Sequence, residues 1–377
     1  MPRIKSLLYA AALLLLPAAA AAHPPTGIVV DAQGRIYFSD LETVWRLDAG
    51  GRLTVFRAGV QGRHVHELSI DRDGNVYGGD VTYEPSTGKQ VEAVWQRTPD
   101  GREVTYLNAP AADPPRGLSI WRDTVGNTYY VEQNRHTNRE TRVLKRTPRG
   151  EVLTLAGGAY GHADGRGTQA RFQSIAGLAF GPGGSLYVTD EGDLRRISPE
   201  GEVRTLATAL EEPMPDDTLT GYGGLMGLAV DACGIVYVAD YGRRRVLKVA
   251  ADGKVTRVVR AEEPWSPTGV AVKSDGKVLI LESGFTPPNV YRGPRVRELA
   301  PDGTLKVLAT VGPKQNVALR PTKSLDVSGR AESESNGVYE KTVEQLELAL
   351  GFYFVLGVVA IGAVAGLKGR TRRKGHA

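Results

Sequence analysis

A sequence pattern with a period of about 40 to 50 residues recurs six times between residues 27 and 310, and such a period is typical of repeat architectures. In the clearest copy, Gly227 to Asp231 is followed by Val236 to Asp240, by Arg245 to Val249 and by the turn Asp252-Gly253. Five further copies begin at Gly27, Glu67, Gly117, Gly177 and Gly269. The chain is therefore expected to fold as six similar units.

Each copy contains four short apolar or alternating runs separated by glycine turns, which is the pattern of a four-stranded antiparallel sheet. Glycine supplies 46 of the 377 residues, well above the usual share of about 7%. Six such sheets arranged radially make a β-propeller. We therefore predict an all-β fold, a six-bladed β-propeller over residues 23–310, with strands A to D of each blade running outward from a central channel.

The repeats resemble those of the NHL-repeat propellers. Gly161 to Phe172, followed by Gly177 to Phe180 and Leu186 to Asp190, is similar to the linker and blade start of that family. The resemblance covers about Thr26 to Thr310 and implies the six-bladed fold. It implies little about activity, because propellers serve as lactonases, lyases, receptors and scaffolds.

Both ends of the chain have the composition of targeting segments. Residues 1–22 combine a short cationic start, an apolar run and the pattern Ala20-x-Ala22 before His23, which predicts a secretory signal peptide. Residues 348–367 form an uncharged apolar run long enough to cross a membrane as a helix, and a basic tail, residues 368–377, follows it. The cation bias predicts a single-pass membrane protein, with the tail in the cytoplasm and the propeller outside, on a polar stalk of residues 311–347.

The net charge of +5 does not indicate a nucleic-acid partner, because the excess cations lie in the two terminal segments and leave the remainder close to neutral. The only cysteine, Cys233, cannot form an intramolecular disulfide, and cysteine zinc sites are excluded. The propeller is therefore expected to rest on its apolar core. No shared closing blade is evident, so we expect blade one to pack directly on blade six.

The connections between strands predict which face of the propeller carries a site. The A-to-B and C-to-D connections are short glycine turns and share one face. The long connections fall on the opposite face: Val81 to Ala93, Gln133 to Thr141, Ala156 to Ala176, Ala207 to Met226 and Ser283 to Pro294. Long loops on a rigid scaffold often bind ligands, so we expect the site there, over the channel mouth.

An acid ends strand B in every blade: Asp40, Asp80, Glu132, Asp190, Asp240 and Glu282. Such a ring could bind a cation. An acid in every blade more often accepts backbone N–H bonds from the following turn, and we favour this structural role. Trp45 and Trp95 fall inside C strands and are expected in the core of their blades.

Histidines and one acid are the candidate metal ligands: His64, His66, Glu67, His136 and His162. Imidazole and carboxylate groups suit a divalent ion such as zinc or calcium. Glu67 stands where the other copies carry glycine, and it is the candidate catalytic base. A salt bridge to Arg63 or Arg116 is the structural alternative. Arg116, Arg243, Arg244 and Arg245 are candidate residues for binding an anionic ligand.

Two further resemblances bear on activity. In the gluconolactonase and regucalcin propellers, acidic or asparagine side chains before the strand-A glycine hold a divalent ion that activates water. The corresponding residues here contain no carboxylate or asparagine: Thr26, His66, Arg116, Ala176, Met226 and Thr268. The peptidyl-hydroxyglycine lyase, an NHL propeller, binds zinc through histidines, and the histidine count permits this.

We therefore predict a module that binds a protein, glycan or small molecule on its looped face. A metal-dependent hydrolase, lactonase- or esterase-like, or a lyase is the alternative.

Overall fold

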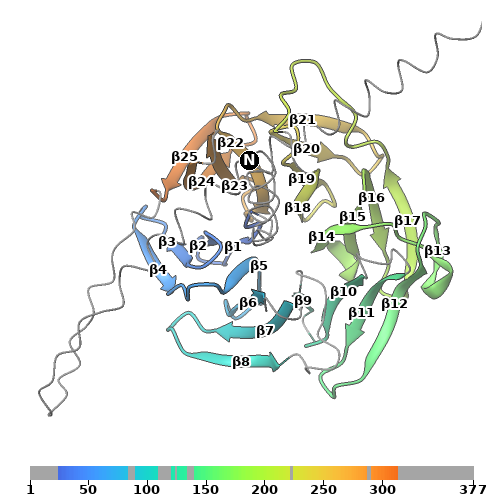
Figure 1. The fold of residues 1–377 in the computed structure, drawn as a ribbon. Helices are drawn as coiled ribbons and strands as arrows, with labels where there is room; N and C mark the ends of the chain where they lie inside the picture. Colours follow the sequence, from blue (N-terminus) through green and yellow to red (C-terminus); the bar gives the residue numbers. More distant parts are fainter. Residues whose placement is uncertain are drawn as a thin grey trace, which may run out of the picture. The chain divides into compact units, whose positions relative to one another are not determined.

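The computed structural model describes residues 24–83, 90–108, 120–123, 125–133, 140–220, 224–286 and 290–312. Within these residues it contains six antiparallel sheets arranged around a central axis (Figure 1). The innermost strands contact one another in sequence from β1 through β5, β9, β14, β18 and β22 back to β1, which closes a ring. The prediction of an all-β, six-bladed propeller is confirmed.

Each blade is built from strands that follow one another in the chain. Blade 1 comprises β1 (Ile28–Val30), β2 (Ile36–Ser39), β3 (Val44–Leu47) and β4 (Leu53–Arg57); blade 2 comprises β5 (His64–Ile70), β6 (Val76–Tyr83), β7 (Gln90–Arg97) and β8 (Glu103–Asn108); blade 3 comprises β9 (Ile120–Arg122), β10 (Thr128–Gln133), β11 (Glu140–Arg146) and β12 (Val152–Ala159). Blade 4 comprises β14 (Ile175–Phe180), β15 (Leu186–Asp190), β16 (Asp193–Ile197) and β17 (Glu202–Ala207); blade 5 comprises β18 (Leu225–Val230), β19 (Val236–Asp240), β20 (Arg245–Val249) and β21 (Val255–Arg260); blade 6 comprises β22 (Trp265–Val272), β23 (Val278–Thr286), β24 (Val290–Leu299) and β25 (Leu305–Thr310).

Three short elements complete the described structure. The linker between blades 3 and 4 contributes β13 (Gly165–Arg166), which pairs with β17 as a fifth strand of blade 4. The 3-10 turn η1 (Gly167–Gln169) follows β13, and η2 (Pro182–Gly184) connects β14 to β15. The linker that resembles an NHL linker thus covers the outer edge of a blade.

The core lies between the blades. Strands β2, β15 and β19 are buried along their whole length, because each blade packs a neighbour on both faces. The described apolar clusters join blades 1 and 2, 3 and 4, 4 and 5, 5 and 6, and 6 and 1.

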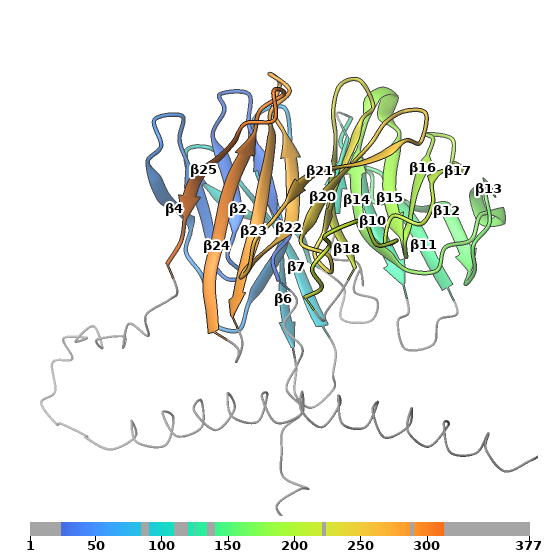
Figure 2. The same cartoon turned by 90° about the horizontal axis from the view of Figure 1, so that it is seen from above.

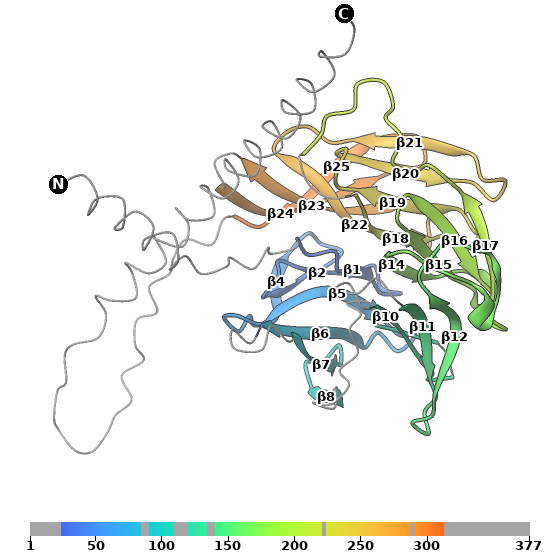
Figure 3. The same cartoon turned by 45° about the vertical axis from the view of Figure 1, so that its right-hand side comes forward.

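Blade 6 closes the ring on blade 1 by packing alone, as predicted. Ile28 and Phe38 of blade 1 share a cluster with Leu281 and Val296 of blade 6. Figure 3 shows β22 and β23 of blade 6 beside β1 of blade 1. Val311, at the predicted start of the stalk, is buried in the same cluster, and its N–H donates to Pro294 O.

The strand-A glycines lie so close to the backbone of the next blade that a side chain does not fit there. A Cβ at Gly177 would lie 2.4 Å from Met226 O, and one at Gly269 would lie 2.1 Å from Thr26 O. A side chain fits at such a position only if a backbone moves. The glycine repeat therefore marks the contacts between neighbouring blades around the channel.

The structure corrects the register of blade 3. Ile120 pairs with Tyr130 as Ile28 pairs with Phe38, so residue 119 and not Gly117 corresponds to Gly27. The turn from β9 to β10 is anchored at Asp123, which accepts a hydrogen bond from Tyr129, as Asp31 does from Tyr37. The long 109–119 segment, which lies outside the described residues, hid this shift of two residues.

Several expected loops are extended strands. Val81 to Tyr83 pairs with Gln90 to Glu92, and Thr286 pairs with Val290. The hairpins β6–β7 and β23–β24 therefore project beyond neighbouring strands on the looped face, at the lower edge of Figure 2. The short connections between strands A and B and between C and D lie at the opposite edge, as expected.

Residues 1–22, the predicted membrane helix 348–367, the tail 368–377 and all of the stalk after Gly312 lie outside the described residues. In the part that is described, no helix is long and apolar enough to span a membrane.

Candidate functional site

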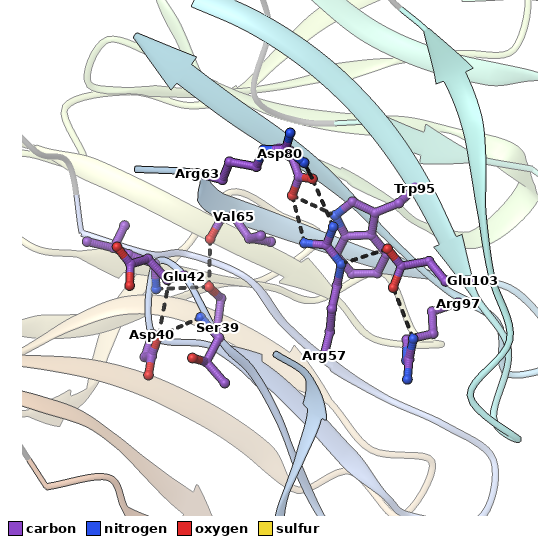
Figure 4. A network of polar contacts seen from close by, with 12 residues as sticks. Ser39, Asp40, Glu42, Arg57, Arg63, Val65, Asp80, Trp95, Arg97 and Glu103 are labelled. Atoms are coloured by element: carbon purple, nitrogen blue, oxygen red, sulfur yellow. Dashed lines mark hydrogen bonds and ion pairs between the residues drawn. The ribbon is translucent and has the colours of Figure 1, made fainter. Parts of the chain in front are cut away.

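The acids that end the B strands are bound by side chains of the protein itself. In blade 1, the Asp40 carboxylate accepts bonds from Trp45 Nε1 at 2.9 Å and from the backbone N–H of Thr43 at 2.8 Å. In blade 2, Asp80 accepts bonds from Trp95 Nε1 at 3.1 Å and from both terminal nitrogens of Arg57 (Figure 4). Buried carboxylates with such partners are already stabilised as anions.

Arg57 links two blades. It lies on β4 of blade 1, reaches Asp80 at 2.7 Å and Glu103 at 3.0 Å in blade 2, and its guanidinium lies 4.5 Å from the Trp95 ring centre (Figure 4). The acids raise the pKa of Arg57 against the lowering effect of burial, which is the largest single influence.

Arginines bind the acid in the remaining blades. The closest oxygen-to-nitrogen distances are 2.6 Å for Glu132 with Arg142, 2.9 Å for Asp190 with Arg195, 2.8 Å for Asp240 with Arg245 and 2.6 Å for Glu282 with Arg295. Arg297 also contacts Glu282. The structural role predicted for these acids is supported, but guanidinium and indole groups, more often than turn amides, supply the hydrogen bonds.

Arg245, a predicted ligand-binding residue, is fully buried and holds the linker between blades 4 and 5. Its side chain bonds Asp240 and Asp217, and Nη2 donates to Leu210 O at 2.7 Å and Glu212 O at 3.0 Å. Burial raises the pKa of Asp240 although Arg245 opposes this shift. The guanidinium has protein acceptors on all three nitrogens and holds residues 210–217 of the linker.

Arg243 and Arg244, which precede Arg245 in the chain, have different surroundings. Arg244 is buried and donates to Trp265 O at 3.0 Å. The Arg243 side chain is half-buried, and its charge lowers the pKa of Glu211, which burial raises overall. Arg116 lies outside the described residues. The arginines predicted to bind a ligand are therefore not one cluster in the described structure.

The predicted histidine ligands are also dispersed. His64 and His66 lie within β5 and not in a loop, because strand A of blade 2 begins at His64; their rings are 5.8 Å apart. His162 lies in the linker before blade 4, with Nε2 2.9 Å from Asp193 Oδ2. His136 is outside the described residues. Among those described, no group of three His, Cys, Asp or Glu side chains is placed to hold a metal ion, so the residues present do not fit a zinc or calcium centre there.

A small cavity of about 30 Å³ lies in the channel at the level of the strand-A glycines. Its lining is Thr26, Gly27, Ile28, Glu67, Leu68, Trp121, Gly177, Leu178, Gly227, Leu228 and Val270. Glu67 is the one charged member of this set. The structure thus places Glu67 in the wall of this cavity, and its roles as metal ligand or catalytic base stay predictions.

A β-bulge positions Glu67. Val65 pairs with Asp80 and Leu68 pairs with Gly78, so His66 and Glu67 together oppose the single residue Gly79. Bulges redirect side chains and are frequent beside active sites. The same register shift occurs at the corresponding place in blades 4, 5 and 6, so the bulge belongs to the repeat, and blade 2 differs from these blades in carrying Glu67 where they carry glycine.

Sequence reasoning did not find the arginine partners of the acids or the place of Trp121 in the channel wall. A signal existed for the first: Asp240 and Arg245, Glu282 and Arg295, and Glu132 and Arg142 are directly opposite each other in the paired B and C strands. Opposite charges at facing positions of a predicted hairpin indicate an ion pair.

Comparison with known proteins supplies the overall fold only. No protein-family model matches the chain, and no curated protein matches it in sequence. Among solved structures, virginiamycin B lyase from Staphylococcus aureus is 14% identical, with a TM-score of 0.47 over 76% of this chain and 84% of that one.

A gluconolactonase from Xanthomonas campestris is 14% identical, with a TM-score of 0.48 over 75% of this chain and 85% of that one. A calcium-binding protein, regucalcin, from Agrobacterium tumefaciens is 17% identical, with a TM-score of 0.48 over 77% and 92%. At these identities the likeness concerns the propeller architecture alone, and membership of the NHL family stays a prediction.

Proposed function

We propose that this chain is an extracytoplasmic binding module, tethered to the membrane through residues 348–367, that takes its ligand at the channel mouth on the looped face. The observation that carries the proposal is the irregularity of this face: the hairpins β6–β7 and β23–β24 project beyond neighbouring strands, and Glu67 lines the channel cavity where blades 1, 4, 5 and 6 carry glycine. Loops and hairpins that project from a rigid scaffold are frequent sites of ligand binding.

The surroundings support this choice over metal-dependent hydrolysis. The described residues that precede or correspond to the position before the strand-A glycine are Thr26, His66, Ala176, Met226 and Thr268, and none is a carboxylate or an amide. The acids at the ends of the B strands are engaged by Arg or Trp side chains. No observation in the described residues favours the hydrolase or lyase alternative.

The linker of residues 208–224 offers a way to test the looped face without unfolding it. Replacement of the whole linker would remove the partners of buried Arg245, whereas Leu219 in the same linker is 70% exposed. Cys233, the only cysteine, is exposed in a short turn on the opposite face.

The experiment attaches a photo-crosslinker to a single cysteine in cells that express the full chain. One variant carries Leu219→Cys with Cys233→Ser, and the matched control keeps Cys233 alone. We expect a specific adduct from position 219 and none from position 233. An adduct from position 233 alone would place the binding surface on the short-turn face and overturn the proposal.

A further inference from the structure

We infer that the junction of blades 4 and 5 on the looped face binds a zwitterionic ligand, with Arg243 holding its carboxylate and Glu211 its ammonium group. This inference rests on the proposed function and names a ligand chemistry for the same face. Arg243 lies in the turn between β19 and β20, and Glu211 lies in the linker before β18. Both side chains are half-buried.

The guanidinium of Arg243 has no bonded partner among the described residues. The backbone N–H of Arg243 donates to Asp240 Oδ1, but its side chain forms no hydrogen bond or ion pair with a described residue, and its Nε is buried. Arg244 and Arg245, which follow it, both donate from their guanidinium groups to protein oxygens. Because a buried donor without an acceptor costs free energy, an anionic group of a ligand would stabilise Arg243.

Backbone contacts place Glu211 beside the turn that carries Arg243. Glu211 Oε1 accepts the Leu225 N–H at 3.2 Å, and a Cβ added to Gly224 would lie 2.3 Å from the same oxygen. Gly224 O in turn accepts the N–H of Tyr241, two residues before Arg243. Burial raises the pKa of Glu211, and the charge of Arg243 opposes this rise without an ion pair between the two groups. The opposite charges therefore lie near each other without contact.

A second acid, Glu191, borders the same junction. It is exposed in the turn between β15 and β16, and the next residue, Gly192, accepts the N–H of Leu210 through its carbonyl oxygen. Burial is the main cause that raises the pKa of Glu211, and the charge of Glu191 adds to this rise. Neither acid forms an ion pair within the described part of the chain. The junction thus holds two unpaired carboxylates for one unpaired guanidinium, and an ammonium group would compensate the excess negative charge.

The charges favour a carboxylate over a phosphate or sulfate group on the ligand. A guanidinium binds the two oxygens of a carboxylate through a pair of parallel hydrogen bonds. A doubly charged anion would bring more negative charge beside Glu191 and Glu211, and nearby like charges disfavour each other. A molecule with one carboxylate and one ammonium group adds no net charge to the junction. Amino acids have this chemistry.

The test measures binding of small probes to the purified full chain by saturation-transfer NMR titration. Glycine, β-alanine and γ-aminobutyrate are zwitterions of increasing charge separation, whereas butyrate and n-butylammonium each carry only one of the two charges. The variants are Arg243→Gln and Glu211→Gln, which remove one charge each. The matched controls are Arg63→Gln and Glu212→Gln, at exposed side chains of the looped face. Thermal melting of each variant reports folding.

We expect the wild type and both controls to bind at least one zwitterion more tightly than butyrate or n-butylammonium. We expect Arg243→Gln and Glu211→Gln each to bind that zwitterion at least about tenfold more weakly. Equal affinity in the wild type and in folded Arg243→Gln or Glu211→Gln would overturn the roles of these residues. Zwitterion binding by the wild type that is absent, or no tighter than that of butyrate, would overturn the ligand class, whereas the crosslinking result at position 219 tests the proposed function separately.

Discussion

Two sets of acids occupy different environments in this propeller. The acids that end the B strands are buried or partly buried and are bound by Arg or Trp side chains of the protein. Glu67 lines the central cavity at a position where blades 1, 4, 5 and 6 carry glycine. The first set recurs in every blade and the second exists in one. The acids that recur in every blade have a structural role. The acid that breaks the repeat, Glu67, is the better candidate for a functional role.

The structural role of the B-strand acids can be tested at Asp240 through two neighbouring arginines. Arg245 and Arg243 differ in burial and in their side-chain contacts. Replacement of Arg245 by Ala leaves buried Asp240 without its guanidinium partner, whereas Asp217 keeps Arg257 at 3.0 Å; removing one partner of a buried ion pair costs about 3–5 kcal/mol. We expect Arg245→Ala to lower the free energy of unfolding by this amount in denaturant titrations.

Arg243→Ala is the matched control, because the Arg243 side chain is half-buried and only its backbone N–H bonds Asp240. We expect a change below about 0.5 kcal/mol, as for ordinary surface substitutions. An equal loss of unfolding free energy in the two variants would show that the ion pairs and hydrogen bonds of Arg245 do not stabilise the linker.

Substitution of a strand-A glycine is expected to give the next largest loss of stability. A Cβ at Gly269 would lie 2.1 Å from Thr26 O, across the closure between blades 6 and 1. We expect Gly269→Ala to destabilise the fold by about 1–3 kcal/mol, the usual range for overpacking. Gly79→Ala is the control, because no atom lies within 4 Å of its added Cβ. A stable Gly269→Ala protein would mean that the closure between blades 6 and 1 tolerates a side chain at this position.

The smallest expected effect is a pH-dependent change in the free energy of unfolding that comes from Glu211. Burial is the main cause that raises the pKa of Glu211, so the folded chain holds this proton more tightly than the unfolded chain. The Glu211 contribution to the free energy of unfolding is therefore lost as pH rises from the ordinary Glu pKa through the raised one.

Glu211→Gln removes this titration. We expect the variant to gain stability relative to the wild type between pH 4 and pH 7, measured by denaturant titration at each pH. Glu212→Gln, at the exposed neighbour, controls for the change of side chain. A stability difference between Glu211→Gln and the wild type that stays constant over this range would contradict the assignment.

The sequence was sufficient to predict the six blades and the two faces, because period-2 patterns and glycine turns are local signals. It misplaced blade 3 by two residues, since a long connection of undetermined register precedes β9. It also could not place Arg245, whose partners Leu210, Glu212 and Asp217 lie 28 to 35 residues away in the chain. Glu67 was identifiable as a break in the repeat, whereas the apolar wall around it depends on how six blades meet.

The proposed function requires that the looped face binds a protein, glycan or small molecule and that no metal centre lies beside Glu67. Its most direct test is the metal content of the full chain, purified without chelator and analysed by plasma mass spectrometry. We predict no stoichiometric divalent ion. One ion per chain that is lost in both Glu67→Gln and His66→Ala would contradict the account and would favour a metal-dependent enzyme.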